Sequence, residues 1–317
     1  MKTKFFFYIF ISLSLIFSNA IANKINNCNQ LLPNTKPSIE NPQLLLAKNS
    51  TKGSSKLDSN LSEKLVYVSI DNSYFIFESH HPKEKQTLSS DLVVASQVLS
   101  DKTTFQIEYF EIFNTKENAN LKLNGNKKEH FYTCLKESNK MDIYDSYFNG
   151  NNWSTPQIMN SNINSKYNET SACLSPDGKT LYFTSDRKGG YGGLDIWKSE
   201  LLDNGEWGPV NNLGPTVNTA SDEESPYVLA DNVTMYFSSK GHNSTGGFDV
   251  FYSTQTDDGY WSNAINAGIT INTKEDELHF KISTDEKYAF YSKANASSNK
   301  NYKIIKTQFD PNSVSMR

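Results

Sequence analysis

The stretch TSACLSPDGKTLYFTSDRKGGYGGLDIW (residues 170–197) decides the fold. Residues 175–178, SPDG, predict a tight turn, because proline fixes φ at the bend and Asp-Gly accepts the positive φ that closes a hairpin. The aromatic run LYFT (residues 181–184) predicts a strand. Glycines between residues 189 and 193 end that strand, and LDIW (residues 194–197) resumes one. The stretch therefore predicts strand, turn, strand, glycine-rich loop and strand.

The same pattern returns every 54 residues. Three tryptophans mark the period: Trp153, Trp207 and Trp261. The same spacing relates Asp195 to Asp249, the glycine pair 192–193 to 246–247, and the glutamates Glu169, Glu223 and Glu277. A unit of this length holds about four strands, and a single four-stranded sheet cannot bury both of its faces. The repeat therefore predicts sheets that cover one another around an axis.

We predict an all-β fold, a β-propeller of four-stranded blades that spans residues 61–310. Dividing that span by the repeat length favours about five blades, with six as the alternative. The last unit runs out near Ile305, so we expect ring closure to take a strand from the N-terminal part. The sequence does not identify that strand.

The N-terminus predicts a secretory signal peptide over residues 1–22. Lys2 and Lys4 precede an apolar run that is too short to span a membrane, and the small-residue site AIA (residues 20–22) follows it. Residues 23–60 are rich in Asn, Ser, Pro and Lys, which predicts an unstructured leader or linker. Lipidation of Cys28 and a disulfide between Cys134 and Cys173 both stay open, because an odd number of irregularly spaced cysteines defines no framework.

The repeat resembles the WD40-like propeller repeat of the TolB type. The likeness rests on SPDG (175–178), LYFTSDR (181–187) and GGLDIW (192–197), and again on WGPVNNLG (207–214), DEESP (222–226) and GGFDVF (246–251). This wording is similar to the propeller part of Bacteroidetes OmpA-family envelope proteins. The resemblance covers residues 130–295 and implies an exported protein of the periplasm or cell surface, associated with the outer membrane. We expect no peptidoglycan-binding domain within these 317 residues.

Composition and motifs exclude several function classes. A formal charge of −4 and a pI near 5.8 give no electrostatic footprint for nucleic acid. After signal cleavage no stretch is long and apolar enough to cross a membrane. The loop KGGYGG (188–193) lacks the Lys-Ser/Thr of a phosphate loop, and neither calcium-loop nor zinc spacing occurs. We therefore predict no cofactor, no metal and no catalytic residue.

Residues that recur in each unit are best explained as architecture. We expect Glu223 and Glu277 to accept backbone N–H bonds that fix one blade to the next, Asp195 and Asp249 to fix loops, and Trp153, Trp207 and Trp261 to pack between blades. A ring of carboxylates near the axis is the functional alternative. Catalysis would require two acids in different environments, which a copied position does not indicate.

The sequence favours a non-enzymatic, exported scaffold that binds an envelope protein or a glycan, as a monomer or within a complex. Two glycine-rich loops carry the candidate partner-binding residues, which are Arg187, Lys188, Tyr191, Lys240 and His242. This assignment rests on fold analogy. The alternative is a carbohydrate-active propeller enzyme, a glycoside hydrolase or lyase, with carboxylates from different blades converging near the axis and Glu223 as the residue to test.

Overall fold

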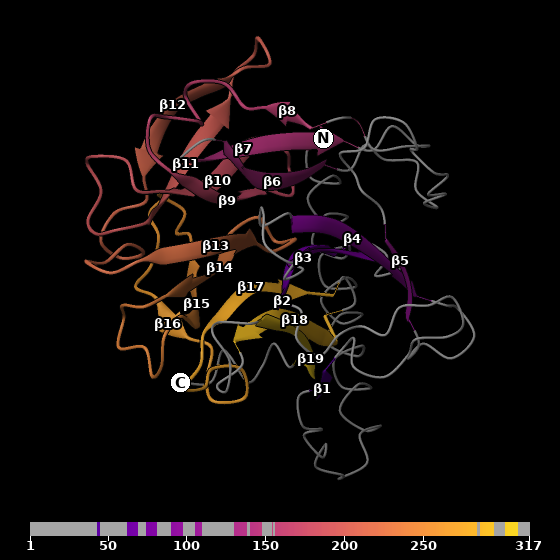
Figure 1. The fold of residues 1–317 in the computed structure, drawn as a ribbon. Helices are drawn as coiled ribbons and strands as arrows, with labels where there is room; N and C mark the ends of the chain where they lie inside the picture. Colours follow the sequence, from indigo (N-terminus) through magenta and orange to yellow (C-terminus); the bar gives the residue numbers. More distant parts are fainter. Residues whose placement is uncertain are drawn as a thin grey trace, which may run out of the picture. The chain divides into compact units, whose positions relative to one another are not determined.

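Sheets of antiparallel strands make up the regular structure of the described residues (Figure 1). The computed structural model describes residues 43–44, 62–68, 74–80, 90–97, 105–109, 130–137, 140–147, 154, 156–283, 286–294 and 302–309. Up to residue 137 this covers the backbone alone, apart from the side chain of Tyr132. All of these residues belong to one compact unit, Asn41–Arg317. The signal peptide, Cys28, the Cys134 side chain and Trp153 lie outside the description.

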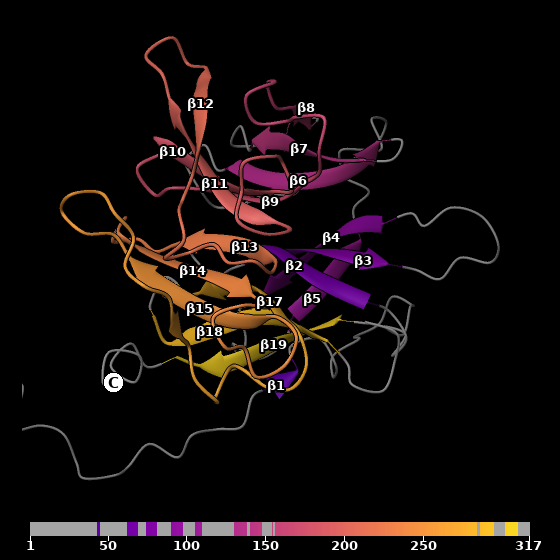
Figure 2. The ribbon, with the colours of Figure 1, turned by 90° about the vertical axis from the view of Figure 1, so that its left-hand side faces the viewer.

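The described strands form five sheets, and four of these are built from consecutive strands alone (Figures 1 and 2). Sheet I holds β2 (Ser62–Val68), β3 (Tyr74–His80), β4 (Ser90–Gln97) and β5 (Phe105–Tyr109). Sheet II holds β6 (His130–Glu137), β7 (Lys140–Tyr147) and β8 (Gln157–Ile158). Sheet III holds β9 (Glu169–Leu174), β10 (Thr180–Ser185), β11 (Asp195–Leu201) and β12 (Trp207–Asn212). Sheet IV holds β13 (Glu223–Val228), β14 (Thr234–Ser239), β15 (Asp249–Thr254) and β16 (Ile265–Asn266).

Sheet V is closed by a strand from the N-terminal part of the chain, as the short last repeat led us to expect. It holds β17 (Glu277–Ile282), β18 (Tyr288–Ala294) and β19 (Tyr302–Gln308), and β1 (Gln43–Leu44) pairs antiparallel with β19. The closing strand therefore comes from the segment for which the sequence predicted no regular structure. Joining the two ends of the chain in one sheet removes an open edge from the ring.

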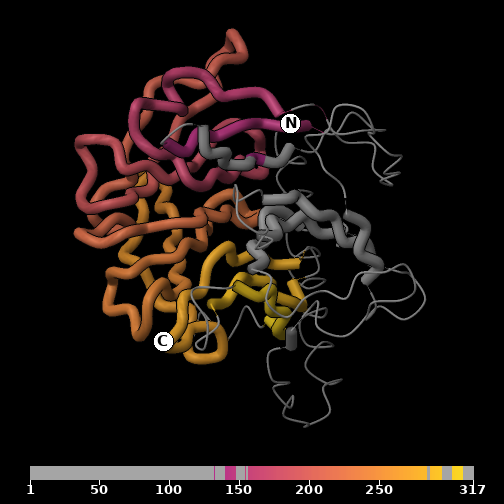
Figure 3. Tube along the Cα trace, viewed as in Figure 1, coloured from indigo at the N-terminus to yellow at the C-terminus, as the bar shows by residue number. Residues whose placement is uncertain are grey.

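Contacts between sheets run in a closed circuit. The first strands of the sheets meet in order, with β2 against β6 and β17, β9 against β7 and β13, and β13 against β17. Figure 3 follows the path through the successive repeats, from magenta through orange to yellow. The strands β2, β6, β9, β13 and β17 are thus the inner strands that surround the axis. The fold is the predicted all-β propeller.

Each repeat places its turns as the sequence predicted. Ser175 accepts the N–H of Gly178, whose φ is 73°, and this closes the turn between β9 and β10. The glycine-rich loops at residues 186–194 and 240–248 join the second strand to the third in sheets III and IV. Because β10 pairs Ser185 with Glu169, these loops lie at the end of the ring where β9, β13 and β17 begin. We call this the loop end.

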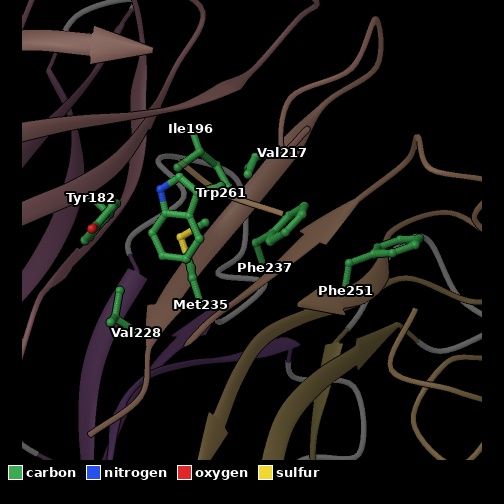
Figure 4. Packing of buried hydrophobic residues seen from close by; sticks show 8 residues of the cluster. All are labelled: Tyr182, Ile196, Val217, Val228, Met235, Phe237, Phe251 and Trp261. Atoms are coloured by element: carbon green, nitrogen blue, oxygen red, sulfur yellow. The ribbon is translucent and has the colours of Figure 1, made fainter. Parts of the chain in front are cut away.

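Apolar side chains fill the space between sheets. Trp261 of sheet IV meets Tyr182 of sheet III edge to face, with ring centroids 5.9 Å apart. Figure 4 shows Trp261 among Tyr182, Ile196 and Met235, in one buried cluster that draws on both sheets. Trp207 packs in the same way against a cluster that includes Ile143 of sheet II. Edge-to-face contact adds to the burial of these large rings.

In each of sheets II, III and IV, one asparagine joins the sheet to the connection that leads to the next sheet. Asn218 accepts the N–H of Ile196 at 2.8 Å and donates to the Ile196 carbonyl at 2.9 Å. The equivalent Asn164 and Asn272 make the same paired contact with Ile143 and Val250. All three asparagines are buried. Each amide therefore hydrogen-bonds to β7, β11 or β15 as one residue of an additional strand would.

Replacing Asn218 with alanine should lower the free energy of unfolding by about 2 kcal/mol. The change leaves the buried N–H of Ile196 without a partner, which costs about 1–3 kcal/mol, whereas the Ile196 carbonyl still accepts the N–H of Leu213. Urea unfolding measures the loss. The exposed Asn211 makes the matched control, because Asn211→Ala should change stability by less than about 0.5 kcal/mol. Equal stability of the two variants would contradict the role assigned to Asn218.

Candidate functional site

The repeated glutamates begin the inner strands and are buried completely. Glu223 accepts the N–H of Thr219 at 2.8 Å, the Thr219 hydroxyl at 2.6 Å and the Ser239 hydroxyl at 2.8 Å. Glu169 repeats this set with Ser165 and Ser185. These carboxylates accept hydrogen bonds from the N–H and hydroxyl groups of the connection that leads into each inner strand. They are not presented to a ligand, so Glu223 is a poor choice of catalytic residue.

The residue before each glutamate fixes neighbouring sheets to one another. Asp222 accepts the N–H of Leu194 at 3.1 Å, and Asp276 accepts that of Phe248 at 3.0 Å. Both donors belong to the preceding sheet's glycine-rich loop. Asp195 and Asp249 are buried and accept N–H groups of those loops, from Tyr191 and Gly192 and from Thr245 respectively, along with the amide of Asn212 or Asn266. Asp195 and Asp249 are thus committed to the fold, whereas Asp276 binds the loop through Oδ1 and accepts the Tyr302 hydroxyl at Oδ2.

Three of the five residues predicted to bind a partner also contact their own fold, and their role in binding stays a prediction. Arg187 donates to Glu169 at 3.1 Å and lies over the rings of Phe183 and Trp197. Lys240 pairs with Asp222 at 2.7 Å and lies over Phe248. His242 contacts the Val217 carbonyl through Nε2 at 2.8 Å. Lys188 and Tyr191 are exposed at the loop end, where their role in binding stays a prediction.

The glutamate of sheet V has a different environment from its two copies. Lys293 stands where Ser185 and Ser239 stand in the other sheets, and its Nζ lies 3.8 Å from Glu277. Burial raises the pKa of Glu277 to about 7, and the nearby charge of Asp249 adds to the rise. Burial also raises the pKa of Glu223, while Glu169 has Arg187 as a full ionic partner. One copied position therefore holds three electrostatically different carboxyl groups.

One acid at the loop end breaks the repeat. Glu224 lies next to Glu223, but the equivalent positions in the other sheets hold Thr170 and Leu278. Its side chain is half-buried, and it accepts the hydroxyl of Thr170, on the neighbouring inner strand, at 2.5 Å. Adjacent residues of a strand point to opposite faces, so Glu224 faces away from the contacts that hold Glu223.

A second carboxylate stands close to Glu224. The Tyr302 hydroxyl donates to Asp276 at 3.1 Å. Burial raises the pKa of Tyr302, and the negative charges of Asp276 and Glu224 both raise it further. The phenol thus lies within the field of two carboxylates that come from adjacent sheets. This is the arrangement at the loop end that the repeat does not account for.

Backbone irregularities accompany this arrangement. The pairing of β13 with β14 shifts register between Glu224 and Tyr227, and that of β17 with β18 shifts between Leu278 and Lys281. Ser225 and His279 lie within these bulges at φ of 57° and 58°. A β-bulge re-aims the side chains around it and is frequent beside active sites. In β13 the sequence signals the bulge with Pro226, which cannot donate to the ladder, whereas β17 has no such residue.

Three further observations concern metal binding, membrane spans and the disulfide that the sequence left open. Among the residues that the structure describes, no three or more His, Cys, Asp or Glu side chains gather where they could hold a metal ion. The described part of the chain also contains no helix of the length and apolarity that a membrane span requires. Cys173 carries a free thiol, so the Cys134–Cys173 disulfide is not formed.

Comparison with known proteins identifies the fold. No family model and no curated protein sequence matches the chain. A solved structure described as a glycoside hydrolase is similar over 90% of this chain and 95% of its own, with a TM-score of 0.59 and 8% identity. A glycosyl hydrolase from Bacteroides ovatus is similar over 88% and 93%, with a TM-score of 0.51 and 12% identity. A putative TolB from Agrobacterium tumefaciens reaches a TM-score of 0.43 at 15% identity. The chain shares the β-propeller fold with these proteins.

These neighbours correct the functional prediction. We expected a non-enzymatic binding scaffold and no enzyme, yet the two structures that share the fold over nearly their whole length are glycoside hydrolases. That finding favours the enzymatic alternative. The prediction of a non-enzymatic protein grouped the acids at residues 222–224 with the copied glutamates, which have a structural role. Aligning the repeats residue by residue would have separated Glu224 from its neighbours.

The three copied glutamates should respond differently to pH. The pKa of Glu277 is raised from 4.5 to about 7 in the folded state, so stability falls as pH rises through this window and the unfolded chain ionises first. Glu277→Gln removes that decline, which amounts to at most about 3 kcal/mol. The stability of Glu277→Gln relative to wild type should therefore be greater at pH 8 than at pH 5, as measured by urea unfolding at both pH values.

The matched control is Glu169→Gln. It leaves Arg187 without its buried partner, which costs about 3–5 kcal/mol. This variant should be less stable than wild type at both pH values. An effect of Glu277→Gln that is the same at pH 5 and pH 8 would contradict the assignment.

Proposed function

We propose that this chain is a propeller-fold carbohydrate-active enzyme, a glycoside hydrolase that acts at the loop end of the axis. The observation that carries the proposal is Glu224, a half-buried acid that departs from the repeat and bridges two inner strands through Thr170. The printed descriptions of the two structures with the same fold, a glycoside hydrolase and a glycosyl hydrolase, support the reaction class.

Hydrolysis of a glycosidic bond uses two carboxyl groups on either side of it. One donates a proton to the departing oxygen, and the other activates water or attacks the anomeric carbon. Glu224 is the carboxyl group assigned to proton transfer, because it is partly accessible and has only hydroxyl donors, Thr170 and Ser225. Asp276 is assigned as the second carboxylate. Tyr302, which donates to Asp276, holds it in position.

The test is hydrolysis by the purified full chain, assayed on aryl glycosides and on arabinan, xylan and other polysaccharides by release of phenol or reducing ends. Glu224→Gln should lower kcat at least about 100-fold, because general acid–base catalysis typically contributes 10²–10⁴-fold. The matched control is Glu206→Gln, at an exposed hairpin position, which should keep wild-type activity. Both variants should unfold at the wild-type temperature.

Two outcomes would overturn the proposal. One is the absence of turnover by the wild-type chain across the whole panel. The other is full activity of Glu224→Gln on a substrate that the wild type cleaves. Glu223→Gln does not serve as the test, since Glu223 is buried and holds the connection between sheets III and IV.

The proposal includes export to the cell envelope, where glycans are accessible. Lys2, Lys4 and the apolar run that follows support a cleaved signal. Expression in a bacterium with a periplasm should yield a mature chain that begins near Asn23, as read by intact mass and N-terminal sequencing. A full-length chain retained in the cytoplasm would contradict export.

A further inference from the structure

Three unlike side chains occupy one register position on the inner strands. Cys173, Tyr227 and Lys281 each lie four residues after the glutamate that begins β9, β13 or β17. All three are half-buried. Cys173 and Lys281 belong to sheets III and V, which sheet IV separates, yet Cys173 lies near enough to influence the pKa of Lys281. Side chains of non-adjacent sheets come this near one another across the axis, so this position faces the axis.

Lys281 is held there by an aromatic ring. Its Nζ lies 4.6 Å from the ring centroid of Tyr227, within the range of a cation–π contact. The Tyr227 hydroxyl donates to the Ile282 carbonyl at 3.3 Å, which fixes the ring beneath the amine. Burial lowers the pKa of Lys281, and the charge of Cys173 opposes this. The amine is thus partly desolvated and held in one place.

Lys281 differs from the cations at the loop end. Lys140, Arg187, Lys240 and Lys293 each pair with an Asp or Glu side chain. No described carboxylate forms an ion pair with Lys281, whose amine lies over the Tyr227 ring. A desolvated cation without a counter-charge is costly, and an anionic ligand removes that cost. The axis therefore has a position suited to a negatively charged group.

We propose that Lys281 binds the anionic group of an acidic sugar, so that the substrate is a glycan with a carboxylated or sulfated unit at its end. This inference rests on the proposed hydrolase function and adds the substrate class. Lys281 lies three residues beyond the register position of Glu224, and because the bulge leaves these opposite only two residues of β18, the separation along the strand is about 7 Å. A glycan that enters from the loop end would reach Lys281 with its terminal unit. The adjoining glycosidic bond would then lie toward Glu224, and short acidic products would be released.

The test measures binding of the full chain by titration calorimetry, with oligosaccharides that end in a uronate, in a sulfated sugar or in the matching neutral sugar. The Glu224→Gln variant is used so that no substrate is turned over. We expect tight binding of one acidic class, and comparing the two classes separates carboxylate from sulfate. Lys281→Gln should weaken that binding about 10- to 100-fold, the range for loss of a charged hydrogen bond. Lys179→Gln, at an exposed lysine in the turn between β9 and β10, away from the loop end, should bind as the parent does.

A second measurement covers the case in which Lys281→Gln does not fold. Raising the salt concentration should weaken binding of the acidic oligosaccharide to the unmodified chain and leave neutral binding unchanged. Equal affinity for acidic and neutral oligosaccharides would overturn the inference, as would wild-type binding by Lys281→Gln. If the wild-type chain hydrolyses neutral glycans and Lys281→Gln hydrolyses them equally well, the inference about acidic sugars is wrong and the proposed hydrolase function stands. If an acidic sugar binds only when Lys281 is present, but the chain hydrolyses no substrate, the hydrolase function is wrong and the anion-binding site at Lys281 stands.

Discussion

The paired contact of a buried asparagine with one backbone residue is the constraint on which the ring depends. In each of three sheets the strand next to the outer strand has an N–H group, at Ile143, Ile196 or Val250, that the ladder does not reach, while the carbonyl of the same residue already accepts one backbone N–H. Asn164, Asn218 and Asn272 supply a donor and an acceptor to those groups from the connection that leads to the next sheet. Aspartate would offer acceptors alone, which explains why an amide stands at these positions. Each contact fixes where the next inner strand begins.

Once the connections are fixed, most polar groups at the loop end are already satisfied. The copied glutamates accept bonds from the connection, and the copied aspartates accept bonds from the glycine-rich loops. A buried carboxylate with such partners has little capacity left for a ligand. Apart from the second oxygen of Asp276, the residues available for chemistry are therefore those that break the repeat. Glu224 and Lys281 are both of this kind, and they stand on adjacent inner strands at different depths along the axis.

Periodicity predicted the fold well, because the 54-residue spacing records which positions are equivalent around the axis. It located the turns, the glycine-rich loops, the tryptophans that pack between sheets and the need for a closing strand. It could not identify β1, whose two residues are too few to show a pattern. It also placed Arg187 on the surface. The side chain turns inward because Glu169 and two aromatic faces are within its reach.

The site was harder to predict, because burial separates residues that look alike in sequence. Glu223 and Glu224 are neighbours of the same type, and only the alternation of the strand directs one into the fold and the other toward Thr170. The bulge of β17 carries His279 rather than glycine or proline, so composition does not reveal it, and only Pro226 marks the bulge of β13.

A copied position also need not have a copied chemistry. The idea that repetition implies a structural role assumes that equivalent residues have equivalent partners. Glu169 faces Arg187, Glu223 faces Ser239 and Glu277 faces Lys293 from further away, so burial acts on three carboxyl groups with different compensation. Burial raises the pKa of Glu277 to about 7 and also raises the pKa of Glu223. Acid–base chemistry depends on such a difference between like groups. Repetition supplies the frame, and replacing one partner per copy is enough to separate the environments within it.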